Sequence, residues 1–163
     1  MASTAYRVCF VCTGNICRSP MGEAVLRARL AEDGLGAVVA VDSAGTGGWH
    51  AGEDADPRTL TALSAAGYRL DHTARQFRPG WFARYDLVVA LDRGHHRELR
   101  AMARRPEDAA KVRLLRSFDP DADGVDVPDP YYGGADGFTA CLALVEAAAD
   151  GLLATVREAV ADR

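Results

Sequence analysis

The 163-residue chain lacks several features that define large functional classes. Its net charge is −4 and it has no cluster of basic residues, which argues against nucleic acid as a partner. It has no run of the roughly 18 apolar residues that a membrane span needs, and residues 1–7 contain no signal-peptide core. We therefore expect no membrane insertion and a cytoplasmic location, with export without a signal peptide left open.

Cysteine is scarce, at four residues, which in an intracellular chain favours reduced thiols over a disulfide framework. Cys9 and Cys12 form a C-x-x-C pair, but it lies inside an apolar, strand-like run and does not open a helix. No second cysteine pair or nearby histidine completes four ligands. The sequence therefore predicts no metal site and no cofactor.

What the chain does contain is typical of one globular domain spanning residues 1–163. Apolar runs predict strands at residues 6–11, 37–41, 85–91 and 112–115. Helical patterns separate them, and a regular apolar stripe predicts a last helix over residues 138–161. Strands that alternate with helices indicate an α/β fold, a doubly wound domain whose four-stranded parallel sheet is flanked by helices on both faces.

Some local details follow from the same patterns. Ser19 and Pro20 are predicted as the N-cap and first residue of the first helix. Asp56 should cap the second helix, which buries Leu60 and Leu63. His95 and the adjacent His96 point to different sides of a helix with no third ligand in view, so both are expected at the surface.

The stretch from Val8 to Pro20 is the most informative part of the chain, because an apolar strand ends at a cysteine shortly before a helix begins. Gly14 and Asn15 tolerate left-handed backbone geometry, so this segment can curl with its N–H groups pointing inward. The helix N-terminus adds a positive dipole end. The pattern predicts an anion-binding loop at the carboxyl end of a strand.

Cys12 and Arg18 supply chemistry to that loop. A thiol beside a helix N-terminus and an arginine is expected to ionise readily. The guanidinium is a planar fork that can hold two oxygens of one phosphoryl group. We therefore interpret Cys12 as a nucleophile and Arg18 as a clamp around one phosphorus atom.

A thiolate that attacks an aryl phosphate needs a proton donor for the departing oxygen. Asp129 is the best candidate, because Pro128 and Pro130 restrict the backbone around its carboxylate. Asp92, at the end of a predicted strand, reaches the same edge of the sheet as the Cys12 loop.

The segment Cys12-Thr-Gly-Asn-Ile-Cys-Arg-Ser19 resembles the signature of the low-molecular-weight protein tyrosine phosphatases, bacterial type. The resemblance implies hydrolysis of phosphotyrosine through a phosphocysteine, with Asp129 as general acid and base. It implies phosphotyrosine-containing proteins and small aryl phosphates as substrates, and inorganic phosphate as product inhibitor. The family often has Asn where His95 stands.

Further roles are implied residue by residue. Ser19 would hydrogen-bond the Cys12 thiolate, and Ile16 stands where relatives directed at phosphoarginine carry a smaller polar residue. Cys17 would protect Cys12 from irreversible oxidation, making the protein redox-regulated. The resemblance implies a substrate-binding set of Thr13, Gly14, Asn15, Ile16, Cys17, Ser19, Trp49, Tyr131 and Tyr132. It also implies a support network of Ser43, His72 and Asp92.

Two kinds of alternative remain open from the residues. An arsenate reductase on the same scaffold would need a relay of downstream cysteines, whereas the only later thiol, Cys141, falls on the apolar stripe of the last helix. A non-catalytic phosphotyrosine-binding or redox-sensing module would have no use for Asp129.

Overall fold

A computed structural model describes residues 5–162 and contains one four-stranded sheet. The strands are β1 (Tyr6–Cys12), β2 (Val39–Gly45), β3 (Leu87–Ala90) and β4 (Val112–Leu114). They lie in the order β2-β1-β3-β4, and every pair is parallel. From β1 the chain continues to β2 on one side of it and then crosses back to β3 on its other side. The strand order therefore reverses between β1 and β3, and ligands bind such sheets at this switch point.

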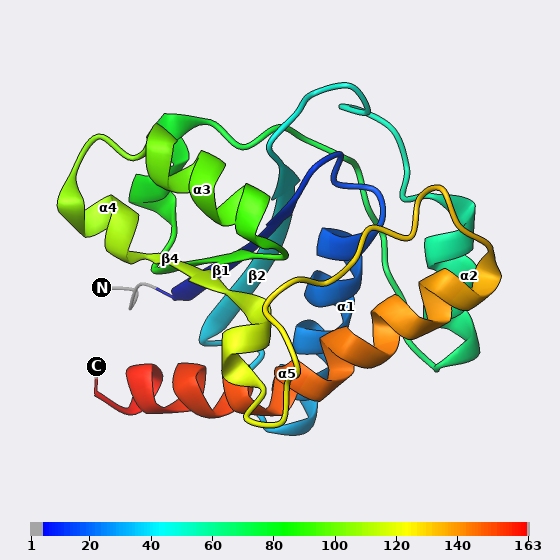
Figure 1. The fold of residues 1–163 in the computed structure, drawn as a ribbon. Helices are drawn as coiled ribbons and strands as arrows, with labels where there is room; N and C mark the ends of the chain where they lie inside the picture. The colour runs from blue at the N-terminus through cyan, green and yellow to red at the C-terminus, as the bar shows by residue number, and fades with distance from the viewer. Residues whose placement is uncertain (1–4, 163) are drawn as a thin grey trace.

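Helices cover both faces of this sheet, as predicted (Figure 1). The helices are α1 (Arg18–Glu32), α2 (Pro57–Ala65), α3 (Arg93–Met102), α4 (Pro106–Ala110) and α5 (Ala135–Ala161), with 3₁₀ turns η1 (Pro79–Arg84) and η2 (Leu115–Phe118). One apolar cluster packs Val8 and Phe10 of β1 against α1 and α5. A second packs Cys9 and Val11 against residues from η1 and α3. Alternate β1 side chains thus serve opposite cores.

The last helix, α5, confirms the predicted stripe and begins three residues earlier than expected. Its length and composition alone would also allow it to cross a membrane, which we did not expect from the sequence. In this fold it packs against α1, α2, β1 and η2. A carbon added at Gly151 would lie 1.9 Å from the carbonyl oxygen of Phe118, so glycine permits the close contact between α5 and η2.

Several predicted boundaries were wrong. The second strand begins at Val39 and continues to Gly45, because the pairing of β2 with β1 extends to the end of both strands. The third strand, predicted from residue 85, begins two residues later, at Leu87. In α2, Asp56 is the N-cap as predicted, but Thr59 is buried in place of Leu60, since its hydroxyl donates to the carbonyl oxygen of Ile16.

Candidate active site

The loop between β1 and α1, residues 13–17, is held in a tight curl. Asn15 has φ 59°, the left-handed geometry predicted for it, whereas Gly14 does not adopt a positive φ. Gly45 makes the curl possible, because a carbon added there would lie 2.6 Å from the carbonyl oxygen of Thr13. Among residues 5–162 we find no hydrogen bond that uses a backbone N–H of residues 13–17. These donors are available to an oxyanion, and we call this segment the phosphate loop.

The first helix begins at Arg18, with Cys17 at the N-cap position and no side-chain cap. The prediction of Ser19 as N-cap was therefore wrong. Its hydroxyl turns instead toward the end of β1, where Oγ lies 3.0 Å from the Sγ atom of Cys12. Ser19 also lies 3.3 Å from the carbonyl oxygen of Ala44, but its single proton can serve only one acceptor at a time. Either Oγ or Sγ can be the donor in the shorter contact, and a Cys12 thiolate, which has no proton, would accept from Ser19.

Asn15 anchors the phosphate loop through both its side chain and its backbone. Its Nδ2 donates to Ser19 Oγ at 2.8 Å and to Ser43 Oγ at 3.0 Å. His72 Nε2 lies 2.6 Å from the carbonyl oxygen of Asn15, and the backbone N–H of Arg75 donates to Oδ1 at 3.0 Å. With every polar atom of the Asn15 side chain engaged, the left-handed residue is fixed in place.

Glu23 terminates this chain of hydrogen bonds and was not identified from the sequence. It is buried in α1, where Oε1 accepts from Ser43 Oγ at 2.6 Å and Oε2 pairs with Arg27 at 2.7 Å. Because the Ser43 hydroxyl donates its one proton to Glu23, its oxygen can act only as an acceptor toward Asn15. In the sequence Glu23 is a charged residue among the apolar residues Met21, Ala24 and Val25, and that is the signal that could have identified it.

Arg18 is buried and held at both ends of its guanidinium. Nη1 donates to Asp92 Oδ2 and to the carbonyl oxygen of Val127, both at 2.8 Å. Nη2 lies 3.7 Å from Asp129 Oδ2, on the pocket side. Burial alone would lower the pKa of Arg18, but the facing Cys12, Asp92 and Asp129 outweigh burial and raise it. A fixed cation therefore sits beside the Cys12 sulfur.

His95 does not lie at the surface, so that prediction was wrong. Only 2% of it is exposed, and Nε2 lies 2.8 Å from Thr13 Oγ1 and 3.4 Å from Arg18 Nη2. Burial and the nearby Arg18 lower the pKa of His95 to about 4. The imidazole is therefore neutral at neutral pH, although it contacts a charged group.

Asp129 lies on the loop that precedes α5, and 44% of its side chain is exposed. Its Oδ1 accepts from the backbone N–H of Tyr131 at 3.0 Å, which orients the carboxylate. Arg58, which the sequence analysis missed, reaches this loop from α2. It donates to the carbonyl oxygen of Gly133 at 3.1 Å, and its guanidinium carbon lies 5.5 Å from the Tyr131 ring centroid.

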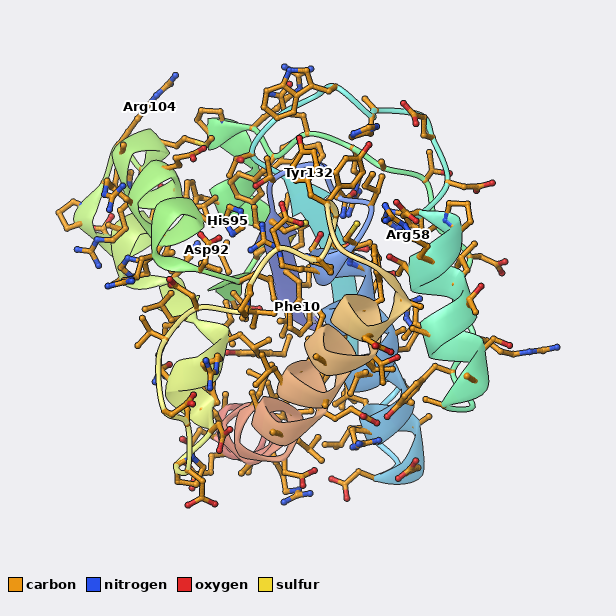
Figure 2. All side chains as sticks on the ribbon, turned by 45° about the vertical axis from the view of Figure 1, so that its right-hand side comes forward. Phe10, Arg58, Asp92, His95, Arg104 and Tyr132 are labelled. Carbon is orange, nitrogen blue, oxygen red and sulfur yellow. The ribbon has the colours of Figure 1, made fainter. Side chains whose placement is uncertain are left out.

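These groups surround a cavity of about 350 Å³. Trp49 and Tyr132 stand at its rim, 74% and 94% exposed, and Figure 2 shows Asp92 and His95 on the α3 side, Arg58 on the α2 side and Tyr132 above. His50 is a wall residue that sequence reasoning missed. The cavity is lined by Cys12, Thr13, Gly14, Ile16, Cys17, Arg18, Trp49, His50, Asp129, Tyr131 and Tyr132.

The remaining thiols differ from Cys12 in their surroundings. Cys17 lines the cavity but is itself buried, and burial followed by the charge of Asp56 raises its pKa to about 12. Cys141 lies on the buried face of α5, in the core as predicted, and burial raises its pKa to about 12. A hydrogen bond with Thr59 acts to lower the pKa of Cys17, but burial outweighs it.

Comparison with known proteins agrees with this geometry. Residues 7–162 match the family model described as low molecular weight phosphotyrosine protein phosphatase. The chain is 68% identical over 160 residues to a low molecular weight protein-tyrosine-phosphatase of Streptomyces coelicolor, covering 97% of this chain and 98% of the relative. It is 48% identical to low molecular weight protein-tyrosine phosphatase A of Mycobacterium tuberculosis, covering 98% and 96%. A crystal structure of YfkJ from Bacillus subtilis superposes with a TM-score of 0.90 at 35% identity, covering 98% and 99%. The chain therefore belongs to the low molecular weight phosphotyrosine protein phosphatase family.

Proposed function

We propose that this protein hydrolyses phosphotyrosine in proteins, and small aryl phosphates, with Cys12 as nucleophile, Arg18 as phosphate clamp and Asp129 as general acid and base. Its family consists of phosphatases, which are hydrolases that act through a phosphocysteine. The observation that carries the residue assignment is the position of Cys12 Sγ. It lies 3.0 Å from Ser19 Oγ, on a cavity whose lining also includes Arg18 and Asp129.

In the first step the Cys12 thiolate attacks phosphorus, and an S–P bond forms as the P–O bond to the aryl group breaks. Asp129 gives its proton to the departing phenolic oxygen. The N–H groups of the phosphate loop and the guanidinium of Arg18 hold the three remaining oxygens, where negative charge accumulates. The phenol leaves, and Asp129 is left as a carboxylate.

In the second step that carboxylate takes a proton from water as the water oxygen attacks the phosphocysteine. The S–P bond breaks, the thiolate of Cys12 returns and inorganic phosphate is released. Because phosphate fits the same loop as the phosphoryl group, we propose that it acts as a product inhibitor. No cofactor is needed for either step.

The walls of the cavity favour a flat aromatic substrate. Trp49, Tyr131 and Tyr132 supply aromatic surface above the phosphate loop, which suits the phenyl ring of phosphotyrosine better than the short side chain of phosphoserine. Ile16 adds an apolar contact at the position where relatives that act on phosphoarginine are expected to carry a smaller polar residue. We therefore propose phosphotyrosine over phosphoarginine.

The proposal extends to the context of the enzyme. We propose a single domain over residues 1–163 that acts in the cytoplasm, or after export without a signal peptide, with no nucleic acid partner and no membrane insertion. We also propose redox regulation of Cys12 through Cys17, whose side chain lines the same cavity.

The competing functions are less consistent with the site. An arsenate reductase passes electrons along a relay of downstream cysteines, whereas the only thiol that follows Cys17 in the sequence, Cys141, is buried in the core. A phosphotyrosine reader gains nothing from Asp129, whose carboxylate faces the pocket beside Arg18.

The experiment that tests the proposal is release of phenolate from an aryl phosphate by the purified protein, with a phosphotyrosine peptide and a phosphoarginine peptide in parallel. We expect turnover of the first two substrates and much slower turnover of the third. Arsenate with a thiol reductant serves as the second assay. Arsenite formation without phosphate release would assign the scaffold to arsenate reduction, and binding without either reaction would make the protein a reader.

A further inference from the structure

The imidazole of His95 is a buried polar group that neither proposed reaction step uses. It belongs to the first turn of α3, whereas Thr13 and Arg18, which contact its Nε2, belong to the phosphate loop and α1. Its other ring nitrogen, Nδ1, lies 3.2 Å from Asp92 Oδ1, too poorly aligned for a hydrogen bond. The hydrogen bonds that such a buried neutral imidazole can make depend on which of its two nitrogens carries the proton.

Three side chains surround this imidazole and form a closed ring with His95. We call Thr13, Arg18, Asp92 and His95 the clamp ring. Arg18 Nη1 donates to Asp92 Oδ2 at 2.8 Å, and Asp92 Oδ1 accepts from the backbone N–H of His95 at 2.9 Å. His95 Nε2 meets Thr13 Oγ1 at 2.8 Å, and Arg18 Nη2 lies 3.5 Å from the same Thr13 oxygen. Figure 2 shows Asp92 and His95 side by side at the N-terminal end of α3.

The donors in the clamp ring fix the tautomer of His95. Arginine can only donate, so the Nε2 atom that faces Arg18 must present a lone pair. The proton then sits on Nδ1, toward the Asp92 carboxylate. The opposite tautomer would set an N–H against the guanidinium N–H groups and a lone pair against a carboxylate oxygen. With Nε2 as acceptor, the Thr13 hydroxyl donates to it and turns its own lone pairs toward Arg18 Nη2.

We propose that His95 is a positioning residue for Arg18: its neutral imidazole, protonated on Nδ1, holds the Thr13 hydroxyl and the Nη2 edge of the guanidinium in the orientation that meets the phosphoryl oxygens. Asp92 fixes the Nη1 edge, and without His95 the Nη2 edge has only the 3.5 Å contact to Thr13 and the 3.7 Å approach of Asp129. This inference rests on the proposed function of Arg18.

Protonation of His95 would reverse the arrangement, because Nε2 would become a donor facing another donor. The charged groups around the imidazole are Arg18 from α1, Asp92 at the start of α3, and Asp126 and Asp129 from the loop before α5. Arg18 opposes protonation and the three carboxylates favour it, and together with burial the balance keeps the pKa of His95 at about 4. The neutral form therefore persists at neutral pH.

Two variants separate positioning from packing. In His95→Gln the amide oxygen can accept from Thr13 where Nε2 did, and the side chain does not titrate. In His95→Leu the volume is roughly kept and the acceptor is lost. We expect His95→Leu to lose on the order of 10- to 100-fold in kcat/KM for an aryl phosphate, through a misplaced clamp. His95→Gln should recover most of that loss, and the control His96→Gln, at the neighbouring residue beside Arg100 and Val112, should behave as wild type.

The tautomer is measured directly by nitrogen NMR of the wild-type protein labelled at histidine, so the question is decided even where His95→Leu unfolds. We expect a protonated Nδ1 and an unprotonated Nε2 for His95. Unchanged kcat/KM in His95→Leu, equal losses in the two His95 variants, or a protonated Nε2 would overturn the inference. Failure of the proposed function itself is distinguishable, because wild type would then release no phenolate at all.

Discussion

Asp129 Oδ2 lies 3.7 Å from Arg18 Nη2, on the pocket side of the guanidinium whose other end is bound to Asp92. The proposed general acid, Asp129, and the proposed phosphate clamp, Arg18, thus face the same space; the Asp129 side chain is 44% exposed and that of Arg18 is 4% exposed. A phosphoryl group between them would have its equatorial oxygens at Arg18 and its leaving oxygen toward Asp129.

Asp129→Asn should slow the enzyme most on substrates with poor leaving groups. Loss of the proton donor is expected to cost about 10²- to 10⁴-fold in kcat for an unactivated phenyl phosphate, and much less for an activated one. A leaving-group series measures the difference. Asp126→Asn is the matched control, since this carboxylate lies three residues away and pairs with Arg93. Equal losses across the series would assign the proton to another group.

Arg18→Lys should be severely impaired although the charge is kept. A lysine ammonium cannot donate to Asp92 and Val127 and still present a second edge to the phosphoryl group, as the fork of Arg18 does. We expect a loss of about 10²- to 10³-fold in kcat, with inorganic phosphate inhibiting less strongly. Steady-state kinetics with and without phosphate would show both effects, and a nearly active variant would contradict the clamp.

Cys17 should make oxidation of Cys12 reversible. Mild peroxide converts an accessible thiolate to a sulfenic acid, which a nearby thiol can trap as a disulfide with loss of water. Wild type should therefore regain activity with dithiothreitol, and peptide mass mapping should show a Cys12 to Cys17 disulfide. Cys17→Ala should become irreversibly inactive sooner, whereas the control Cys141→Ala, which removes a core thiol, should recover like wild type. Equal recovery by all three proteins without that disulfide would make Cys17 structural.

His95 should make the folded protein less stable in acid. Its pKa falls from 6.5 to about 4 on folding, through burial and the charge of Arg18. Between these two values the unfolded chain binds a proton that the folded state does not, so the free energy of unfolding falls as pH drops through this window. The loss is on the order of 3 kcal/mol at its full extent. Denaturant unfolding at pH values across the window should show a shallower dependence in His95→Gln, and identical slopes would contradict the account.

Much of the fold could be predicted from the sequence because its signals are local. Burial of β1, of β3 and of one face of α5 can be seen in the apolar residues of each element alone. The N-cap is also a local signal, because Asp56 directly precedes the helix that it caps. The strand boundaries were less accurate. The end of β2 depends on pairing with β1 and not on its own hydrophobicity, since the polar Asp42 and Ser43 lie within the strand.

The sequence predicts those residues of the candidate site that lie within a recognisable motif. Cys12, Arg18 and Asp129 are indicated by the chemistry of their own segments, and the structure brings all three to one cavity. Glu23, Arg58 and His95 were missed because each also contacts a residue in another part of the fold; Glu23 meets Ser43 across 20 positions. His95 meets Thr13 across 82 positions and Arg58 meets Gly133 across 75. The prediction of Ser19 as N-cap was wrong, because the helix begins before it, at Arg18, whereas the hydrogen bond between Ser19 and Cys12 that the resemblance implied is present.

Cys12 is expected to carry the phosphoryl group between the two steps of the reaction. The most direct test is to mix the wild-type enzyme with an excess of an activated aryl phosphate, quench within the first turnovers and map the phosphorylated peptide by mass spectrometry. Cys12→Ser serves as control, because it should bind phosphate without turning over substrate at an appreciable rate. We predict one phosphoryl group on the sulfur of Cys12 in wild type. A full burst of phenolate with no phosphate on the protein, or with phosphate on another residue, would contradict the account.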